Sequence, residues 1–134
     1  MPVWKLLTLT ATFAVALGGS ACRGRDAQLH QAAQSVESIR ATTSTVAMAW
    51  LAGELSDRFA QDAVARAFQL AEQTRTELSS SPESMADTRA SAIVEDCQHL
   101  SRLLSHLSDS IQRHDRAAAQ DALVDVSAPF ASFQ

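Results

Sequence analysis

The chain is 134 residues long, which leaves room for one domain, and its 46% hydrophobic and 19% charged residues are typical of a globular protein and exclude a disordered one. The formal net charge is −4, since 15 acidic residues outnumber 11 basic ones, and the basic residues are scattered singly along the chain. No basic stripe is present to neutralise phosphates, so nucleic-acid binding is not expected.

The first pattern in chain order is an N-terminal leader. Lys5 supplies one positive charge, residues 6–17 form an uncharged apolar run, and small residues follow at 18–21. These three parts in this order are typical of a secretory signal. The apolar run is shorter than the roughly 20 residues that a membrane-spanning helix needs. We therefore expect residues 1–21 to be a signal peptide that is removed.

The leader ends in Gly-Ser-Ala-Cys at positions 19–22, which resembles the lipobox of bacterial lipoprotein precursors. This resemblance implies that Cys22 becomes the mature N-terminus and carries fatty-acyl chains such as palmitate, which anchor it stably in a membrane. The protein would then be a lipid-anchored component of the cell envelope. By resemblance to proteobacterial lipoproteins, Arg23 after the cysteine, in place of the aspartate that typically retains them in the inner membrane, implies the outer membrane where two membranes exist. The alternative is cleavage after Ala21 without acylation, giving a soluble periplasmic or secreted protein.

Residues 22–27 are expected to form a short arm, and residues 28–134 the folded body. The body contains Gly53 as its one glycine and is rich in Ala, Gln, Glu, Arg and Leu, so helix propensity is high nearly throughout. The apolar period predicts a helix at about 27–52, ended by Gly53. Ser56 is a suitable N-cap for a second helix at 57–79, whose central stripe consists of alanines.

Ser81 and Pro82 predict the start of a third helix at 82–112. Its apolar residues alternate spacings of four and three, which is a heptad seam. Asp115 predicts the cap of a fourth helix at 116–127, and the alternative is one unbroken helix over 82–127. Short connections make successive helices antiparallel, so the expected fold is all-α, an up-down-up-down four-helix bundle. The seam residues are Ala86, Ala90, Ile93, Cys97, Leu100, Leu104, Leu107 and Ile111.

Two cofactor classes were considered for such a bundle. Residues 96–99 (Asp-Cys-Gln-His) approach the Glu-x-x-His motif of di-iron bundles, but the chain has no second copy. At 100° per residue, His99 points away from the seam, which is typical of a solvated histidine. A Cys-x-x-Cys-His haem-attachment motif is also missing from the sequence. We expect neither a metal nor another cofactor.

Three polar residues lie on apolar faces or at their edge: Cys97, Arg40 and Asp96. Cys97 occupies a seam position, where a thiol behaves as a small inert hydrophobe; if Cys22 is not acylated, a Cys22–Cys97 disulfide is the alternative. Arg40 projects from the apolar face of the first helix and needs a partner. We expect an Arg40–Asp96 pair that sets the helix register. The alternative is a polar pocket around Arg40 for a small anion.

The sequence contains no nucleophile elbow, phosphate-binding glycine loop or paired-carboxylate cleft, so an enzyme is not expected. The favoured hypothesis is a membrane-anchored envelope lipoprotein whose bundle contacts a protein partner or itself. The alternative is a bundle of the periplasm or cell surface that binds a metal, haem or a small anion. We expect Pro129, Phe130 and Phe133 to fold back over the end of the bundle. The apolar side chains suited to partner contact are Phe59, Phe68, Val124, Phe130 and Phe133.

Overall fold

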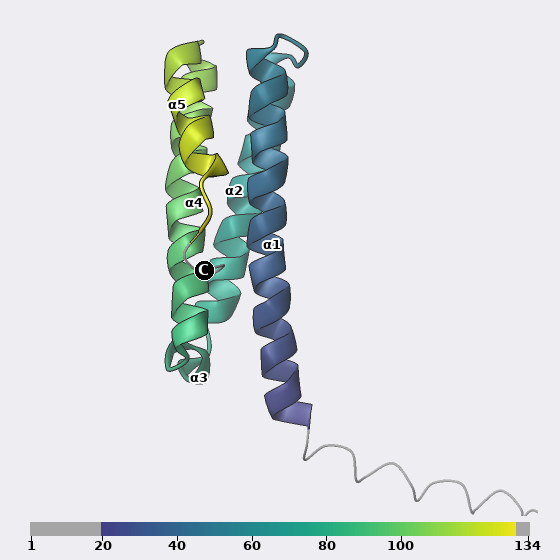
Figure 1. The fold of residues 1–134 in the computed structure, drawn as a ribbon, viewed down its shortest axis with the longest axis vertical. Coiled ribbons are helices and arrows are strands. Elements are labelled where there is room, and N and C mark those ends of the chain that lie inside the picture. The colour runs from purple at the N-terminus through teal and green to yellow at the C-terminus, as the bar shows by residue number, and fades with distance from the viewer. Residues whose placement is uncertain (1–19, 131–134) are drawn as a thin grey trace, which may run out of the picture.

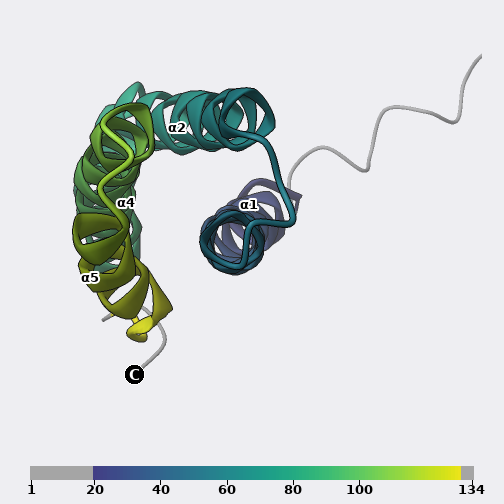
Figure 2. The same cartoon turned by 90° about the horizontal axis from the view of Figure 1, so that it is seen from above.

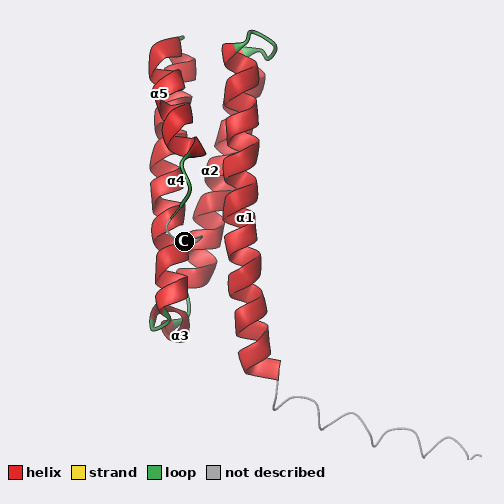
Figure 3. Cartoon of the chain, viewed as in Figure 1, coloured by secondary structure: helices red, strands yellow, loops and turns green. Residues whose placement is uncertain are grey.

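The computed structural model describes residues 20–130, with side chains from Gly24 onward. Within this range the chain is helical and contains no strand (Figure 3). The all-α prediction is therefore confirmed. The helices are α1 (Ser20–Leu51), α2 (Asp57–Ser79), α3 (Pro82–Met85), α4 (Thr88–Gln112) and α5 (Arg116–Ser127).

The four long helices form an up-down-up-down bundle, as predicted. Figure 1 shows α1, α2, α4 and α5 side by side, each antiparallel to the one before. Seen from above, α2, α4 and α5 follow a curved row and α1 faces its concave side (Figure 2). Helix α1 thus packs on α2, α4 and α5, and α4 packs on both of its neighbours in the row. At its N-terminal end α1 extends past the rest of the bundle (Figure 1).

The core follows the stripes that the sequence shows. The α4 seam from Ala90 to Ile111 is buried. It faces the alanine stripe of α2, where Ala60 and Ala71 have no exposed surface. Side chains this small let two helices approach closely, because the distance between helix axes depends on the residues at the contact. The contact between α2 and α4 is accordingly the most extensive in the bundle.

The turn between α1 and α2 forms as the sequence predicts. Gly53 adopts the left-handed backbone conformation with φ +78°, and the amide of Glu54 donates to the Ala49 carbonyl over 2.9 Å. This is a Schellman end, in which a glycine satisfies carbonyls that the last helical turn leaves unpaired. Ser56 then caps α2 by accepting a hydrogen bond from the amide of Phe59 at 3.3 Å.

The turn between α4 and α5 has the same design without a glycine. His114 adopts a left-handed conformation with φ +54°, and the Asp115 amide donates to the Ser110 carbonyl over 2.8 Å. The Asp115 carboxylate caps α5 by accepting from the Ala118 amide at 3.0 Å. The predicted break at this point is confirmed, and the alternative of one continuous helix from 82 to 127 is wrong.

Two predicted helix boundaries differ from the structure. Helix α1 begins at Ser20, earlier than the expected start at about Ala27. The segment predicted as one helix over 82–112 is interrupted after α3, because the Asp87 carboxylate accepts from the Arg89 amide at 2.9 Å and caps α4. An aspartate at this position favours a cap over a helix interior, since its side chain competes for backbone donors. Ala86, expected in the seam, is consequently exposed.

The segment after α5 continues in the same direction along α4 (Figure 1). Phe130 is buried and packs edge-to-face on His99, with 5.9 Å between the ring centroids. The chain therefore covers the side of α4, and not the end of the bundle as expected. Phe133 lies outside the described residues.

Candidate functional site

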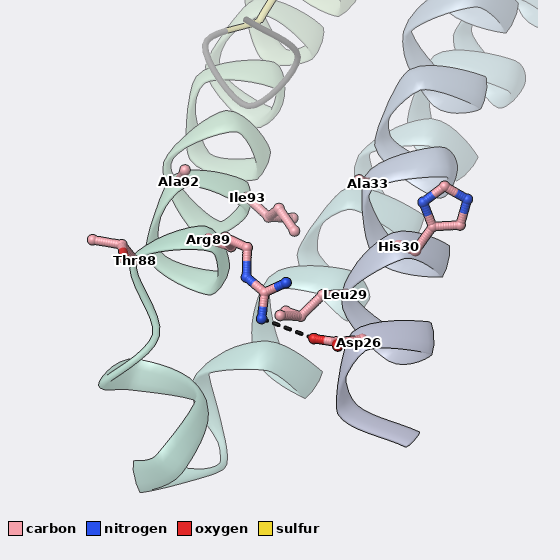
Figure 4. A pocket seen from close by; sticks show the side chains of 8 residues that line it. All are labelled: Asp26, Leu29, His30, Ala33, Thr88, Arg89, Ala92 and Ile93. Atoms are coloured by element: carbon pink, nitrogen blue, oxygen red, sulfur yellow. Dashed lines mark hydrogen bonds and ion pairs between the residues drawn. The ribbon is translucent and has the colours of Figure 1, made fainter. Parts of the chain in front are cut away.

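A shallow hollow lies between α1 and α4, near the end of the bundle at which α1 protrudes. Its volume is about 600 Å³, within the range of small-molecule sites. Leu29 of α1 and Ile93 of α4 project into the gap and form an apolar floor, and both side chains are buried (Figure 4). Asp26 and Arg89 face each other at the rim, whereas His30 points away (Figure 4). The lining residues are Asp26, Leu29, His30, Ala33, Thr88, Arg89, Ala92 and Ile93.

The charges at this rim are paired within the protein. The Arg89 guanidinium donates to Asp26 at 2.9 Å and to Asp87 at 3.1 Å. Hydrogen bonds from the Arg89 side chain lower the pKa of the Asp87 carboxyl, and the hydrogen bond from the Arg89 backbone amide lowers it further. The same carboxylates raise the pKa of Arg89. With two carboxylates around one guanidinium, the rim is slightly acidic and offers no spare positive charge to an anion.

A second ion pair joins the same two parts of the chain. Arg25 of α1 contacts Glu83 of α3 at 3.2 Å. Together with the Arg89–Asp26 pair, this contact connects the first turns of α1 to the corner formed by α3 and α4. All four side chains are at least partly exposed, so each pair stabilises the fold only modestly. Both pairs lie where α1 extends past the rest of the bundle.

Cys22, the predicted lipidation site, belongs to the first turn of α1. Its side chain lies outside the part of the chain whose side chains are described. The structure therefore places the backbone of this position on the protruding end of α1, one turn before Asp26. The predicted arm over 22–27 is helical and continuous with the bundle.

Arg40 is held by α1 and α5. Its guanidinium forms an ion pair with Glu37, one helical turn earlier, and donates to the Val126 and Ser127 carbonyls at 3.3 and 3.0 Å. Hydrogen bonding to Glu37 raises the pKa of Arg40 despite its partial burial, and the same bond lowers the pKa of Glu37. Positive charge at the last carbonyls of a helix is favourable for the helix dipole. Arg40 is thus a cap for α5, and the pair with Asp96 stays a prediction.

Asp96 and Cys97 are both buried on α4. Burial is the main cause that raises the pKa of the Cys97 thiol to about 11, and the Asp96 and Glu72 carboxylates add to it. Cys97 forms no disulfide within the described part of the chain. A thiol that keeps its proton at neutral pH is a poor nucleophile, which agrees with the predicted inert core cysteine.

His99 does not meet further ligands of a metal. Its imidazole is exposed and contacts the Phe130 ring. Among the side chains described between 24 and 130, no group of three or more His, Cys, Asp and Glu residues is placed to hold a metal ion.

The far end of the bundle carries a polar network that the sequence did not indicate. The Trp50 indole donates to Asp57 at 2.7 Å, and the other oxygen of Asp57 lies 3.3 Å from the His114 imidazole. Arg116 donates to the Leu51 carbonyl at 2.6 Å and stacks on Trp50. These contacts connect the two turns at this end. The Ser56 and Asp115 caps predicted the two turns themselves. No local sequence pattern predicts contacts between residues so distant in sequence.

The predicted contact residues divide into exposed and buried ones. Phe59, Phe68 and Val124 are exposed, as expected for a docking surface, whereas Phe130 is only 4% exposed and the prediction for it is wrong. The reason is that the segment after α5 folds onto α4. Three further apolar side chains are exposed: Met48, Leu70 and Met85.

Within residues 20–130, none of the helices is both long and apolar enough to cross a bilayer. Comparison with known proteins found no matching family model, no matching curated protein and no matching solved structure.

Proposed function

We propose that this chain is a lipid-anchored protein of the bacterial cell envelope whose helical bundle acts as an interaction module. In this proposal residues 1–21 are removed, Cys22 is acylated, and the bundle is carried at the membrane surface, on the outer membrane where two exist. The bundle acts by contacting a protein, either a partner or a second copy. No catalytic step is proposed.

The observation that carries the proposal is the position of Cys22. The lipobox-like sequence ends at Cys22, which lies in the first turn of α1; this helix runs from Ser20 to Leu51 and protrudes from the bundle (Figure 1). A cysteine at the free tip of a protruding helix can reach the bilayer without unfolding any part of the core. Two or more acyl chains there would give stable anchoring.

The interaction role is supported by the surface. Large apolar side chains are exposed on α1, α2 and α5, including Met48, Phe59 and Val124 at 54%, 57% and 61% exposure. Charged residues are depleted, and aromatic residues and methionine enriched, at the centres of protein interfaces. Exposed side chains of this kind are therefore the positions at which we expect a protein partner to dock.

The test of the anchor is the mass of the mature N-terminal peptide from protein made as the full chain in a bacterium with two membranes. We expect residues 1–21 to be absent and Cys22 to carry acyl chains, with radiolabelled palmitate incorporated. Cys22→Ala should lose the label. Cys97→Ala is the matched control, because it removes the other cysteine, and it should keep the label.

Two outcomes would contradict this proposal. An unmodified Cys22 at the mature N-terminus would support the soluble periplasmic or secreted alternative. Intact protein that still carries Met1 and Trp4 and is recovered from the cytosol would exclude export altogether.

A ligand-binding bundle is the second candidate, and the hollow at Leu29 and Ile93 is the observation that favours it. Its apolar floor and slightly acidic rim suit a small uncharged or cationic molecule better than an anion. Ile93→Trp would fill the hollow. Loss of a co-purifying small molecule in this variant, detected by mass spectrometry of native protein, would support this candidate, and an identical extract from both proteins would reject it.

A further inference from the structure

The outer face of α1 carries a second heptad stripe, separate from its buried face. Its residues recur at alternating spacings of three and four and are all exposed. This spacing keeps side chains on one line along a helix, the geometry that a seam between two helices needs. Apart from Met48, the members are small or uncharged polar residues. We call these residues the outer stripe: Gln31, Gln34, Ser38, Ala41, Thr45, Met48 and Ala52.

The outer stripe lacks any Asp, Glu, Lys or Arg. Between positions 27 and 53 the sequence contains only two such residues, Glu37 and Arg40. These two pair with each other, and Arg40 reaches the carbonyls at the end of α5, so neither belongs to the stripe. The outer faces of α2 and α4 differ from the outer stripe of α1, because both carry charges of either sign. The charged residues are Arg58, Asp62 and Arg66 on α2, and Glu95, Arg102 and Asp109 on α4.

Apolar side chains flank the outer stripe on the side of α2. Leu70 is 52% exposed and lines a small groove together with Ser38 and Ile39 of α1. Phe59 lies on the same side of α2 as Leu70, since the two positions are about three full helical turns apart. With Met48 inside the stripe, three of the large apolar side chains that are exposed gather on this part of the surface.

We propose that the outer stripe is the seam of a homodimer, in which a second copy of this chain packs its α1 in parallel against the first. This inference rests on the proposed anchor, which decides the orientation. Two copies held in one membrane through Cys22 have the same end of α1 at the bilayer, so the symmetry axis runs along the membrane normal and the helices are parallel.

The missing charge favours a second copy over an unrelated partner. In a parallel two-fold dimer each residue near the axis faces its own counterpart, so any charge there would meet an identical charge. A partner of different sequence could accept charges on this face by presenting opposite ones. An uncharged stripe flanked by apolar side chains allows self-association without repulsion between like charges.

The size of the stripe sets the strength of the dimer. Residues 31–52 span about 32 Å of helix at 1.5 Å per residue. A strip of this length, about 10 Å wide, with its flanks buries on the order of 1,000 Å² in total, the lower limit for a specific interface. The dimer is therefore weak in dilute solution. Anchoring both copies in one membrane raises their effective concentration and favours the dimer without new contacts.

Cysteine cross-linking in the native membrane tests the seam. Ala41→Cys and Thr45→Cys are made separately in full-length protein that carries Cys97→Ala and keeps Cys22. Gln69→Cys, which is exposed on the outer face of α2, is the matched control. Under mild oxidation we expect a disulfide-linked dimer at positions 41 and 45 and at least tenfold less at 69, because a disulfide requires Cα atoms within about 7 Å.

A charge variant tests the physical argument. Ala41→Glu places two carboxylates face to face, and we expect it to reduce cross-linking at Thr45→Cys at least tenfold. Gln69→Glu adds the same charge away from the stripe and should leave it unchanged. No cross-link at 41 or 45, or equal cross-linking at 69, overturns the dimer.

The mass of the N-terminal peptide from the same samples separates the two proposals. Acylated Cys22 without cross-linking at 41 and 45 leaves the anchor intact and rejects the dimer. Unmodified Cys22 with cross-linking confined to those positions rejects the anchor and keeps the self-association through α1.

Discussion

Cys97 has no exposed surface and lies in the middle of the α4 seam. Since burial raises its pKa to about 11, above the ordinary thiol value of 9.0, the folded protein holds this proton at pH values where the unfolded chain loses it. The thiol therefore contributes its full stabilising effect below pH 9. That contribution is lost as the pH rises from about 9 to about 11.

We predict that the free energy of unfolding falls by about 1.4 kcal/mol per pH unit in this window, measured by urea denaturation and relative to Cys97→Ala. The chain suits the measurement, because it has no tyrosine and its one lysine is Lys5 in the leader. Cys22→Ala in both proteins removes the other thiol. The same flat profile with and without Cys97 would contradict the raised pKa of this thiol in the folded protein.

Arg40 shows what a sequence can and cannot predict about a polar residue. Its place on the apolar face of α1 indicated that it needs a partner. The partners observed are Glu37, a near neighbour in the sequence, and two backbone carbonyls of α5. The sequence does not predict that Arg40 meets those carbonyls, because their position depends on how far α5 extends along α1.

We predict that Arg40→Met destabilises the protein by about 1 to 3 kcal/mol, because a charged donor to the last carbonyls of α5 is lost. The measurement is denaturant unfolding, together with hydrogen exchange, which should quicken over residues 120–127. Arg75→Met is the control. Arg75 forms the same kind of ion pair with Glu72, but among the described residues it donates to no helix-end carbonyl. An equal effect of both substitutions would show that the ion pair, and not the cap, stabilises the fold.

At the scale of helices, boundaries with a turn residue or a cap were predictable. Gly53, Ser56 and Asp115 each marked an end that the structure contains. The interruption between α3 and α4 was missed, because the apolar period continues from Ala86 to Ala90 through Asp87. A heptad pattern reports which residues share a face and is insensitive to one broken turn. The early start of α1 was missed because residues 20–26 carry no apolar stripe.

The two Schellman ends allow a paired prediction. Gly53 and His114 both have positive φ, and a Cβ at Gly53 would meet no atom within 4 Å. Gly53→Ala should therefore cost only the backbone strain, about 1 kcal/mol, and His114→Gly should stabilise by up to about 1 kcal/mol. The exposed His114–Asp57 pair changes this little. Thermal unfolding midpoints that move in the opposite directions would contradict the proposed strain.

At the scale of the whole molecule, the bundle and its topology followed from composition, periodicity and short connections. The side-chain contacts at the two ends did not. Arg89 meets Asp26, and Asp57 meets His114, across long stretches of chain. Such pairs depend on which helix ends become neighbours, so the bundle has to be known before they can be predicted.

The ion pairs near the N-terminal end of α1 give a prediction at this scale. The double variant Arg25→Ala, Arg89→Ala removes both connections between the first turns of α1 and the α3–α4 corner. Because these pairs are exposed, we expect the unfolding midpoint to change little. Hydrogen exchange over residues 24–30 should become faster, while residues 100–111 stay protected. Unchanged exchange over 24–30 would show that Leu29 alone holds this part of α1.

Helix α1 has 32 residues and no break between Cys22 and the turn at Gly53, which makes it about 48 Å long. A flexible linker would let the turns at Gly53 and His114 approach the N-terminal end of α1. An unbroken helix keeps them apart by a distance that does not change. If Cys22 is anchored as proposed, these turns meet a partner at up to about 48 Å from the attachment point.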